Sequence, residues 1–127
     1  LIRVKRKSLR LGIKKARPGN TIGDIGNTIQ RFIEGQGYGV VRDLCGHGIG
    51  RELHEDPQIP NFGNRHEGVE LKENMVICIE PMVTAGNFNV KRANDGQTFV
   101  TKDNSLAAHF EDTMLITADG AEVLTVN

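Results

Sequence analysis

The stretch at residues 45–57, CGHGIGRELHEDP, constrains the fold more than any other part of this chain. Three glycines alternate there with His47 and Ile49. Because glycine lacks a Cβ, such a backbone can turn tightly or approach another group closely. Two histidines, His47 and His54, lie seven residues apart on it. A histidine set among these glycines is atypical of an ordinary core, so we interpret the stretch as part of a functional site.

Length and charge limit what the rest of the chain can be. Its 127 residues make one domain with room for a buried core. Lys and Arg number 16 and Asp and Glu 16, so no net field indicates nucleic acid or membrane as a partner. Five cations between Arg3 and Arg10 are the local exception, and we interpret them as a solvated helix face, with nucleic-acid contact as the less favoured reading.

Cysteine usage and the ends of the chain add two expectations. Cys45 and Cys78 have the spacing of neither a disulfide framework nor a zinc ribbon, so reduced thiols in a cytoplasmic protein are expected. The sequence has no signal-peptide pattern and no apolar run of the roughly 18 residues that span a bilayer. The chain begins with Leu inside a predicted element, so we expect it to be a piece of something larger.

Two helices are predicted first. Residues 2–16 are rich in helix formers and place Ile2, Leu9 and Ile13 near one stripe, and the helix is expected to end before Pro18. Thr21 followed by Asp24 predicts a capped second helix. Its apolar residues at helical spacing are Ile22, Ile25, Ile29, Phe32 and Ile33.

Strands follow the helices. Residues 38–42 and 75–80 read as strands, with residues 57–68 as an irregular surface loop that holds a solvated His66. Residues 83–85 and 97–101 are expected to form a hairpin across the turn at 94–96. Two further strands are predicted at residues 109–117 and 122–126.

Two carboxylates stand out because Glu80 and Glu111 occupy strands that otherwise look buried. Period-two alternation puts Glu111 on one face with His109, Thr113 and Leu115, and the other face carries Phe110, Asp112, Met114 and Ile116. Buried carboxylates are costly unless a cation or an arginine pairs with them. The residue types leave two readings open: Mn, Fe, Co or Zn held by His47, Glu80 and Glu111, or a structural network of acids and arginines.

Other hydrolytic sites fit less well. Neither His54 nor His66 begins an HExxH pattern, which excludes a thermolysin-like site. The glycines do not form a phosphate-binding loop, and no GxSxG elbow is present. A nucleophilic pair of Cys45 and His47 lacks a residue to orient it, which disfavours a thiol protease.

Three motifs in this order, CGHGIGRELHEDP, MVICIEPMVTAG and SLAAHFEDTMLIT, resemble the C-terminal half of type I methionine aminopeptidases. The resemblance runs from about residue 9 to residue 126. It implies an α/β architecture of the α+β type, the pita-bread fold, of which this chain would be the C-terminal half with a curved antiparallel sheet and two helices. Residues 1–127 would form a single partial catalytic domain. Proline-specific aminopeptidases and dipeptidases share parts of these motifs.

Site roles are implied by the same resemblance. His47 and Glu80 would ligate one divalent metal and Glu111 would bridge to a second. A hydroxide bridging the two metals would attack the first peptide bond, with Glu80 moving the proton and His54 contacting the scissile carbonyl. Second-rank candidates near the methionine pocket are Leu53, Met82 and His109.

The implied activity is removal of the N-terminal methionine from nascent polypeptides, with the ribosome surface as a further partner and no sequence-specific nucleic acid. The family's site also needs two aspartates and a histidine from an upstream half, and the aspartates here match neither. This chain alone is therefore expected to hold one metal or none. Gln97 follows Gly96 of the turn at residues 94–96, where the family often has a large aromatic residue. The alternatives are a non-catalytic module that uses the basic first helix to bind ribosome or partner, and a proline-specific peptidase.

Overall fold

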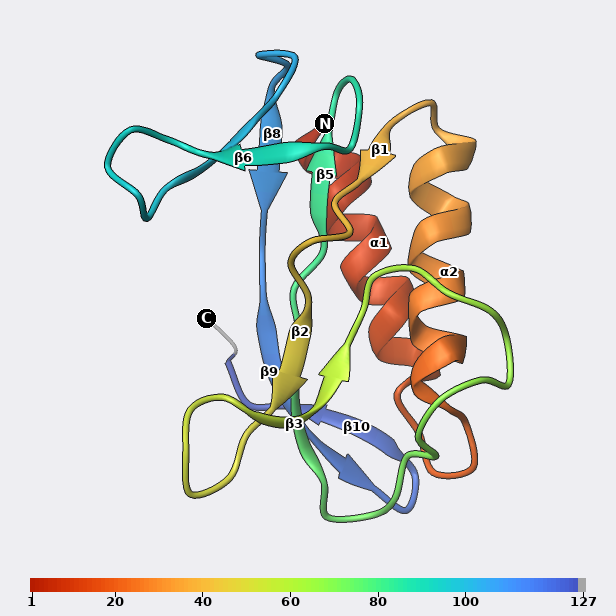
Figure 1. Cartoon of the computed structure of the whole chain (residues 1–127). Coiled ribbons are helices and arrows are strands. Elements are labelled where there is room, and N and C mark those ends of the chain that lie inside the picture. The colour runs from red at the N-terminus through yellow and green to blue at the C-terminus, as the bar shows by residue number, and fades with distance from the viewer. Residues whose placement is uncertain (126–127) are drawn as a thin grey trace.

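The computed structural model describes residues 1–125, and two helices packed side by side open the chain (Figure 1). Helix α1 spans Ile2–Lys15 and α2 spans Ile22–Gly35, as predicted. Thr21 caps α2: its hydroxyl accepts a hydrogen bond from the Asp24 backbone N–H at 3.3 Å, and the Asp24 carboxylate accepts one from the Thr21 N–H at 2.8 Å. This reciprocal capping box confirms the sequence prediction.

Within residues 1–125, ten strands make three antiparallel sheets. The five-stranded sheet has the order β10-β9-β4-β2-β3, the three-stranded sheet β1-β5-β8, and β6 pairs with β7. The strands are β1 Gly39–Val40, β2 Gly46–Gly48, β3 Glu55–Ile59, β4 Val76–Ile79, β5 Met82–Thr84, β6 Val90–Arg92, β7 Phe99–Thr101, β8 Ala107–His109, β9 Asp112–Thr117 and β10 Gly120–Val123.

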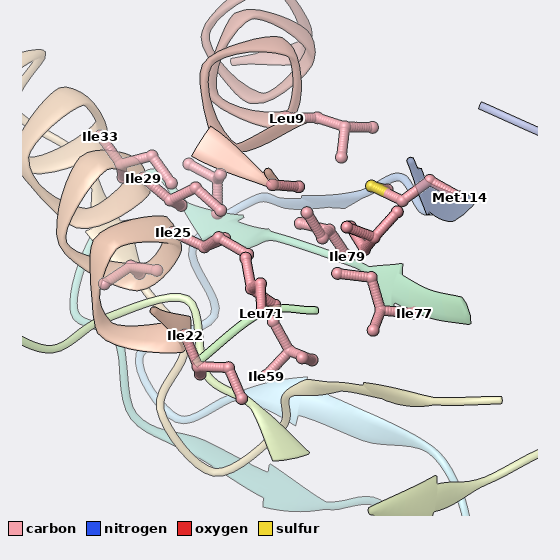
Figure 2. Close-up of a cluster of buried hydrophobic side chains, with 14 residues drawn as sticks. Leu9, Ile22, Ile25, Ile29, Ile33, Ile59, Leu71, Ile77, Ile79 and Met114 are labelled. Atoms are coloured by element: carbon pink, nitrogen blue, oxygen red, sulfur yellow. The ribbon is translucent and has the colours of Figure 1, made fainter. Parts of the chain in front are cut away.

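Aliphatic side chains between the helices and the five-stranded sheet form the core (Figure 2). Ile25, Ile29 and Ile33 of α2 are fully buried there, and Ile77 and Ile79 of β4 meet them from the sheet. Met114 and Ile116 of β9 lie in the same core, which confirms their predicted face. Since side chains alternate along a strand, the residues between these point away from the helices. The sheet therefore has a helix-covered face and an opposite face.

Two long segments each cross from one sheet to the other. β4 leads into β5 through Glu80 and Pro81, and β8 leads into β9 through Phe110 and Glu111. Pro81 has no N–H to donate, so the ladder is interrupted there. Ile79 pairs with Asp112 before the interruption and Met82 pairs with His109 after it. Two residues intervene on each strand, so the register continues without a shift and Glu80 lies opposite Glu111.

Several predicted strands differ from those observed. The hairpin across residues 94–96 joins β6 to β7, whereas β5 pairs with β1 and β8, so the predicted pairing of 83–85 with 97–101 was wrong. Residues 55–59 form β3 as an edge strand where a loop from residue 57 was expected. The predicted strand 109–117 is divided between two sheets. The strand predicted at residues 122–126 is observed as β10, Gly120–Val123. Residue 126 lies outside the described residues.

The buried face of α1 also contains other residues than predicted. Leu9 is buried, but Ile2 is 60% exposed and Lys5 is only 1% exposed. Lys5 therefore does not belong to a solvated basic face: its ammonium lies over the Phe110 ring, and burial lowers the pKa of Lys5 to about 8. The wrong assignment arose because helix periodicity reports an apolar stripe and cannot show that an aliphatic lysine stem packs in it.

Candidate metal centre

Glycine allows β2 to occupy the position between β3 and β4. A Cβ on Gly46 would overlap the carbonyl of Cys78, and a Cβ on Gly48 would overlap the carbonyl of Asp56. The glycines thus allow β2 to lie close to its two neighbouring strands, as the glycine pattern predicts. On the β4 side, His47 pairs directly with Cys78. Paired residues project to the same side of a sheet, so His47 lies on the face opposite the helices.

Period-two alternation along β4 and β9 brings the predicted carboxylates to that same face. Cys78 and Glu80 are two residues apart on one segment, and Thr113, which pairs with Cys78, is two residues from Glu111 on the other. Three short segments distant in sequence therefore place His47, Glu80 and Glu111 together. Two groups of donor atoms, each within 4.8 Å of one another, result: His47, Cys78 and Glu80, and Glu80, His109 and Glu111.

The hydrogen bond of the His47 ring determines which nitrogen is free. Its Nδ1 lies 3.0 Å from the carbonyl oxygen of Gly48. A carbonyl only accepts, so Nδ1 carries the proton. Nε2 then presents its lone pair to the Glu80 carboxylate, 3.5 Å away. A backbone carbonyl that fixes the tautomer in this way is the usual arrangement for a metal-binding histidine.

The distance between His47 and Glu80 fits a cation between them. At 3.5 Å it exceeds the 2.7–3.2 Å of ordinary N–H···O hydrogen bonds. Two donors bound to one tetrahedral metal at roughly 2.0–2.1 Å lie about 3.3 Å apart. A neutral imidazole and a carboxylate facing each other repel unless a proton or cation separates them. The donor set and its spacing therefore fit a divalent metal.

Burial makes Glu80 the most constrained carboxylate of the site. Its side chain is 13% exposed, and burial raises its pKa, with a further contribution from the charge of Glu111. The Cys78 thiol donates a hydrogen bond to Glu80 at 3.4 Å. Burial and this carboxylate raise the pKa of Cys78 to about 12. Cys78 is therefore a neutral hydrogen-bond donor to the carboxylate, and it does not supply a thiolate ligand.

Asn61 is a buried residue of this site that the sequence did not reveal. Its side-chain amide donates a hydrogen bond to the backbone carbonyl of Glu80 at 3.2 Å, across 19 residues of sequence. The side chain is fully buried, and its Oδ1 has no hydrogen-bond partner within the described residues. The sequence predicts that Asn61 lies in the irregular surface loop at residues 57–68. Composition shows that a segment is irregular, but it does not show that the segment folds back under a strand end.

The other predicted residues lie at the margin of the centre. The rings of His47 and His54 are 4.3 Å apart, centre to centre, and His54 is exposed. Glu111 is also exposed, with 57% of its side chain accessible, so its predicted burial was wrong. Glu111 lies at the strand interruption on the face away from the helices, and no other element of residues 1–125 packs over it closely enough to bury it.

An apolar cavity of about 610 Å³ adjoins the centre. It contains Met82 and His109, two of the residues expected near a methionine pocket. Leu53 is 68% exposed and is not among the described residues that line the cavity. Gln97 is exposed as well. Other lining residues are Val41, Leu44, Phe99 and Leu106.

His66 and the cysteines behave as predicted. The His66 side chain is 87% exposed and lies away from the centre, near Asp24 of α2. Both cysteines are free. Within residues 1–125, no helix has the length and apolar character that crossing a membrane requires.

A profile of metallopeptidase family M24 matches residues 1–118 of this chain. A methionine aminopeptidase of Mycoplasma capricolum is 52% identical over 125 residues, which are 98% of this chain and 50% of that protein. One from Clostridium perfringens is 49% identical over 126 residues, 99% of this chain and 51% of that protein. The chain thus spans about half the length of the curated relatives it matches.

Solved structures give the same result. The crystal structure of the methionine aminopeptidase of Thermotoga maritima matches all of this chain with a TM-score of 0.98 and 51% identity, and the match covers 51% of that structure. The prolidase of Pyrococcus furiosus matches 98% of the chain with a TM-score of 0.72 and 29% identity, and the match covers 31% of that protein. These likenesses confirm the predicted resemblance and the α+β fold of half a pita-bread protein.

Proposed function

This chain belongs to metallopeptidase family M24, and from that premise we propose that residues 1–127 are the ligand-bearing C-terminal half of a methionine aminopeptidase catalytic domain. The whole protein removes the N-terminal methionine from nascent polypeptides in the cytoplasm. The convergence of His47, Glu80 and Glu111 from three segments on one sheet face carries this proposal. The sequence identity of about half between this chain and methionine aminopeptidases supports the choice of substrate.

His47 and Glu80 hold one divalent metal through Nε2 and a carboxylate oxygen. Glu111, opposite Glu80 in the strand register, would help to hold a second metal, together with ligands from an upstream half. Imidazole and carboxylate donors suit Co, Mn, Fe or Zn. Divalent metals at such a site supply a water of lowered pKa and polarise the peptide carbonyl.

Residues of this chain perform the remaining steps. Glu80 takes a proton from the attacking water and returns it to the leaving amine. His54, beside His47 and exposed, donates to the oxygen that becomes negative in the transition state. The apolar cavity that contains Met82 and His109 receives the methionine side chain.

Hydrolysis of Met-Ala-Ser by the full-length protein, with Co or Mn titrated in, tests this function. We expect release of methionine that depends on the metal and is abolished by Glu80→Gln. An Ala-Pro dipeptide and a peptide with proline in second position, assayed in parallel, test the proline-specific activity of the same fold. Absence of methionine release at every metal concentration would overturn the proposal. Faster cleavage of the proline substrates would assign the chain to the other branch of the family.

A second candidate function rests on α1. Arg3, Arg6, Lys7 and Arg10 line an exposed hollow of about 740 Å³ on this helix. A basic surface of this kind suits an anionic partner such as the ribosome. Co-sedimentation with ribosomes at increasing salt tests it, with an Arg6→Glu, Arg10→Glu variant as the comparison. Salt-independent binding, or binding that survives both charge reversals, would contradict this function.

A further inference from the structure

We infer that Asn27 and Gln30 of α2 are positioning residues for the metal centre, on which they act through residues 60–67. The inference rests on the proposed function, because the centre in question is the one that contains Glu80. Both residues belong to the helix layer, whereas the centre lies on the opposite face of the sheet. A role in metal binding would therefore be carried across the sheet by the 60–67 segment.

The 60–67 segment lies directly against one face of α2 (Figure 1). A Cβ on Gly26 would overlap the carbonyl oxygen of Phe62, and a Cβ on Gly23 would overlap that of Asn64. The two glycines are three residues apart, so they lie on the same side of the helix. Because they have no side chains, the backbone of the segment can pack against the helix there.

Two amide side chains of α2 hold the segment at Gly63. Gln30 Oε1 accepts a hydrogen bond from the Gly63 N–H at 3.1 Å, and Asn27 Nδ2 donates one to the Gly63 carbonyl oxygen at 2.9 Å. An N–H only donates and a carbonyl only accepts, so these bonds fix the orientation of both amides. The φ of Gly63 is +141°, a conformation that favours glycine. Both polar groups of this one residue are thus held by the helix.

Asn61 connects this anchor to the metal centre. It is fully buried, and its side-chain amide donates a hydrogen bond to the Glu80 carbonyl at 3.2 Å. That carbonyl lies where Pro81 interrupts the ladder, outside the paired strands on either side. Only Phe62 separates Asn61 from Gly63, so a shift of Gly63 moves Asn61 and the backbone that carries the Glu80 carboxylate. Groups that orient a metal ligand act on metal affinity.

Calorimetric titration of the metal-free, full-length protein with Co²⁺ tests the inference. Gln30→Leu removes the acceptor for the Gly63 N–H and should weaken binding by about 2- to 30-fold, the range for substitutions that act through a packed network. Gln30→Glu keeps an acceptor oxygen and should restore most of the affinity. Asn27→Asp turns a second acceptor toward the Gly63 carbonyl and should weaken binding. Arg31→Gln, at an exposed position of the same helix, is the control and should bind normally.

A double-mutant cycle with Asn61→Ala tests the route. If Gln30 acts through Asn61, Gln30→Leu weakens Co²⁺ binding in the unmodified protein but adds little in the Asn61→Ala variant. Additive effects would overturn this route. Hydrogen exchange of the Gly63 amide in the metal-free protein reports the bond itself: it should be faster in Gln30→Leu and slow again in Gln30→Glu.

The remaining outcomes separate the inference from the proposed function. Unchanged affinity in Gln30→Leu overturns the inference and leaves the proposed function in place. Equal losses in Gln30→Leu and Gln30→Glu also overturn it, because the hydrogen bond would then not be the cause. If the unmodified protein binds no Co²⁺, the proposed function fails as well. Circular dichroism checks the folding of each variant, and if Gln30→Leu does not fold, Asn27→Asp against Arg31→Gln decides in the same way.

Discussion

Glu80 and Glu111 lie opposite each other in two antiparallel segments, at the point where both segments leave one sheet and enter another. The interruption at Pro81 frees this pair from the hydrogen-bonded ladder while the register on either side keeps them aligned. His47 approaches the pair from β2, which the glycines allow to lie close to β4. The candidate centre is therefore a consequence of strand register.

Substitutions of the two histidines in the glycine-rich stretch should have different effects, one on metal affinity and the other on kcat. His47→Gln is expected to lower the affinity for Mn²⁺ because it removes a nitrogen ligand. His54→Gln should leave metal affinity unchanged and lower kcat by about 10²–10³, the usual cost of losing one transition-state donor. Metal content by atomic emission and kinetics on Met-Ala-Ser, measured on both variants, check this. Equal metal loss in both variants would contradict the division of roles.

Gly46 should tolerate no side chain. Gly46→Ala would drive a Cβ into the Cys78 carbonyl of β4, where the obstacle is backbone. We expect a loss of at least about 1–3 kcal/mol in the free energy of unfolding, as for other overpacked sites, together with weaker metal binding. Gly35→Ala at the end of α2, where a Cβ meets nothing within 4 Å, is the matched control and should be neutral. Denaturant unfolding of both variants makes the comparison, and equal stability would refute the close-approach explanation.

Asn61 should support the site without touching substrate. Asn61→Ala removes the donor to the Glu80 carbonyl and leaves that buried acceptor unpaired, at a cost of about 1–3 kcal/mol. The same change should weaken metal binding, because the Glu80 backbone loses its anchor. Thermal unfolding with and without Mn²⁺ measures both effects. The account is contradicted if stability falls while the metal-dependent increase in Tm stays the same.

Asp24 should make stability depend on pH through the α2 cap. Burial raises the pKa of Asp24, but hydrogen bonds from Thr21 and His66 outweigh it, so the pKa lies below its ordinary 3.8. A lowered folded-state pKa means that the contribution is fully present above pH 3.8 and is lost as pH falls through the folded-state value. Asp24→Asn should cost about 0.5–2 kcal/mol near neutral pH, the range for helix caps.

The pH comparison for Asp24 needs a matched carboxylate. Asp119→Asn changes an exposed residue in the turn before β10 and should parallel the unmodified protein at every pH. Urea unfolding between pH 7 and pH 2 supplies the curves. The curve of Asp24→Asn should meet that of the unmodified protein at the acid end. A constant gap across the whole range would show that the cap does not depend on the carboxylate charge.

Local patterns predicted much of this fold. The capping box at Thr21 and Asp24 and the apolar faces of α2 and β4 depend on residues close in sequence, and the structure confirms them. Strand pairing depends on contacts between distant segments, and here the prediction failed for the hairpin at 94–96. Alternation assigned Glu111 to a face, but it could not show that the segment changes sheets just before β9.

The candidate site was predictable to a similar extent. Motif resemblance selected His47, His54, Glu80 and Glu111, and the structure brings His47 next to both Glu80 and His54. Burial of Lys5 and of Asn61 was not foreseen, because both residue types are usually exposed. Their burial depends on which distant segment packs over them, and the local patterns of a single sequence do not predict that packing.

Anomalous diffraction from crystals of the full-length protein grown with Mn²⁺ tests the central claim most directly. The account predicts a peak bound by His47 Nε2 and a carboxylate oxygen of Glu80, with Glu111 extending from it toward a second metal. A peak bound only by carboxylates with the His47 ring turned away would contradict it, as would manganese bound elsewhere on the chain.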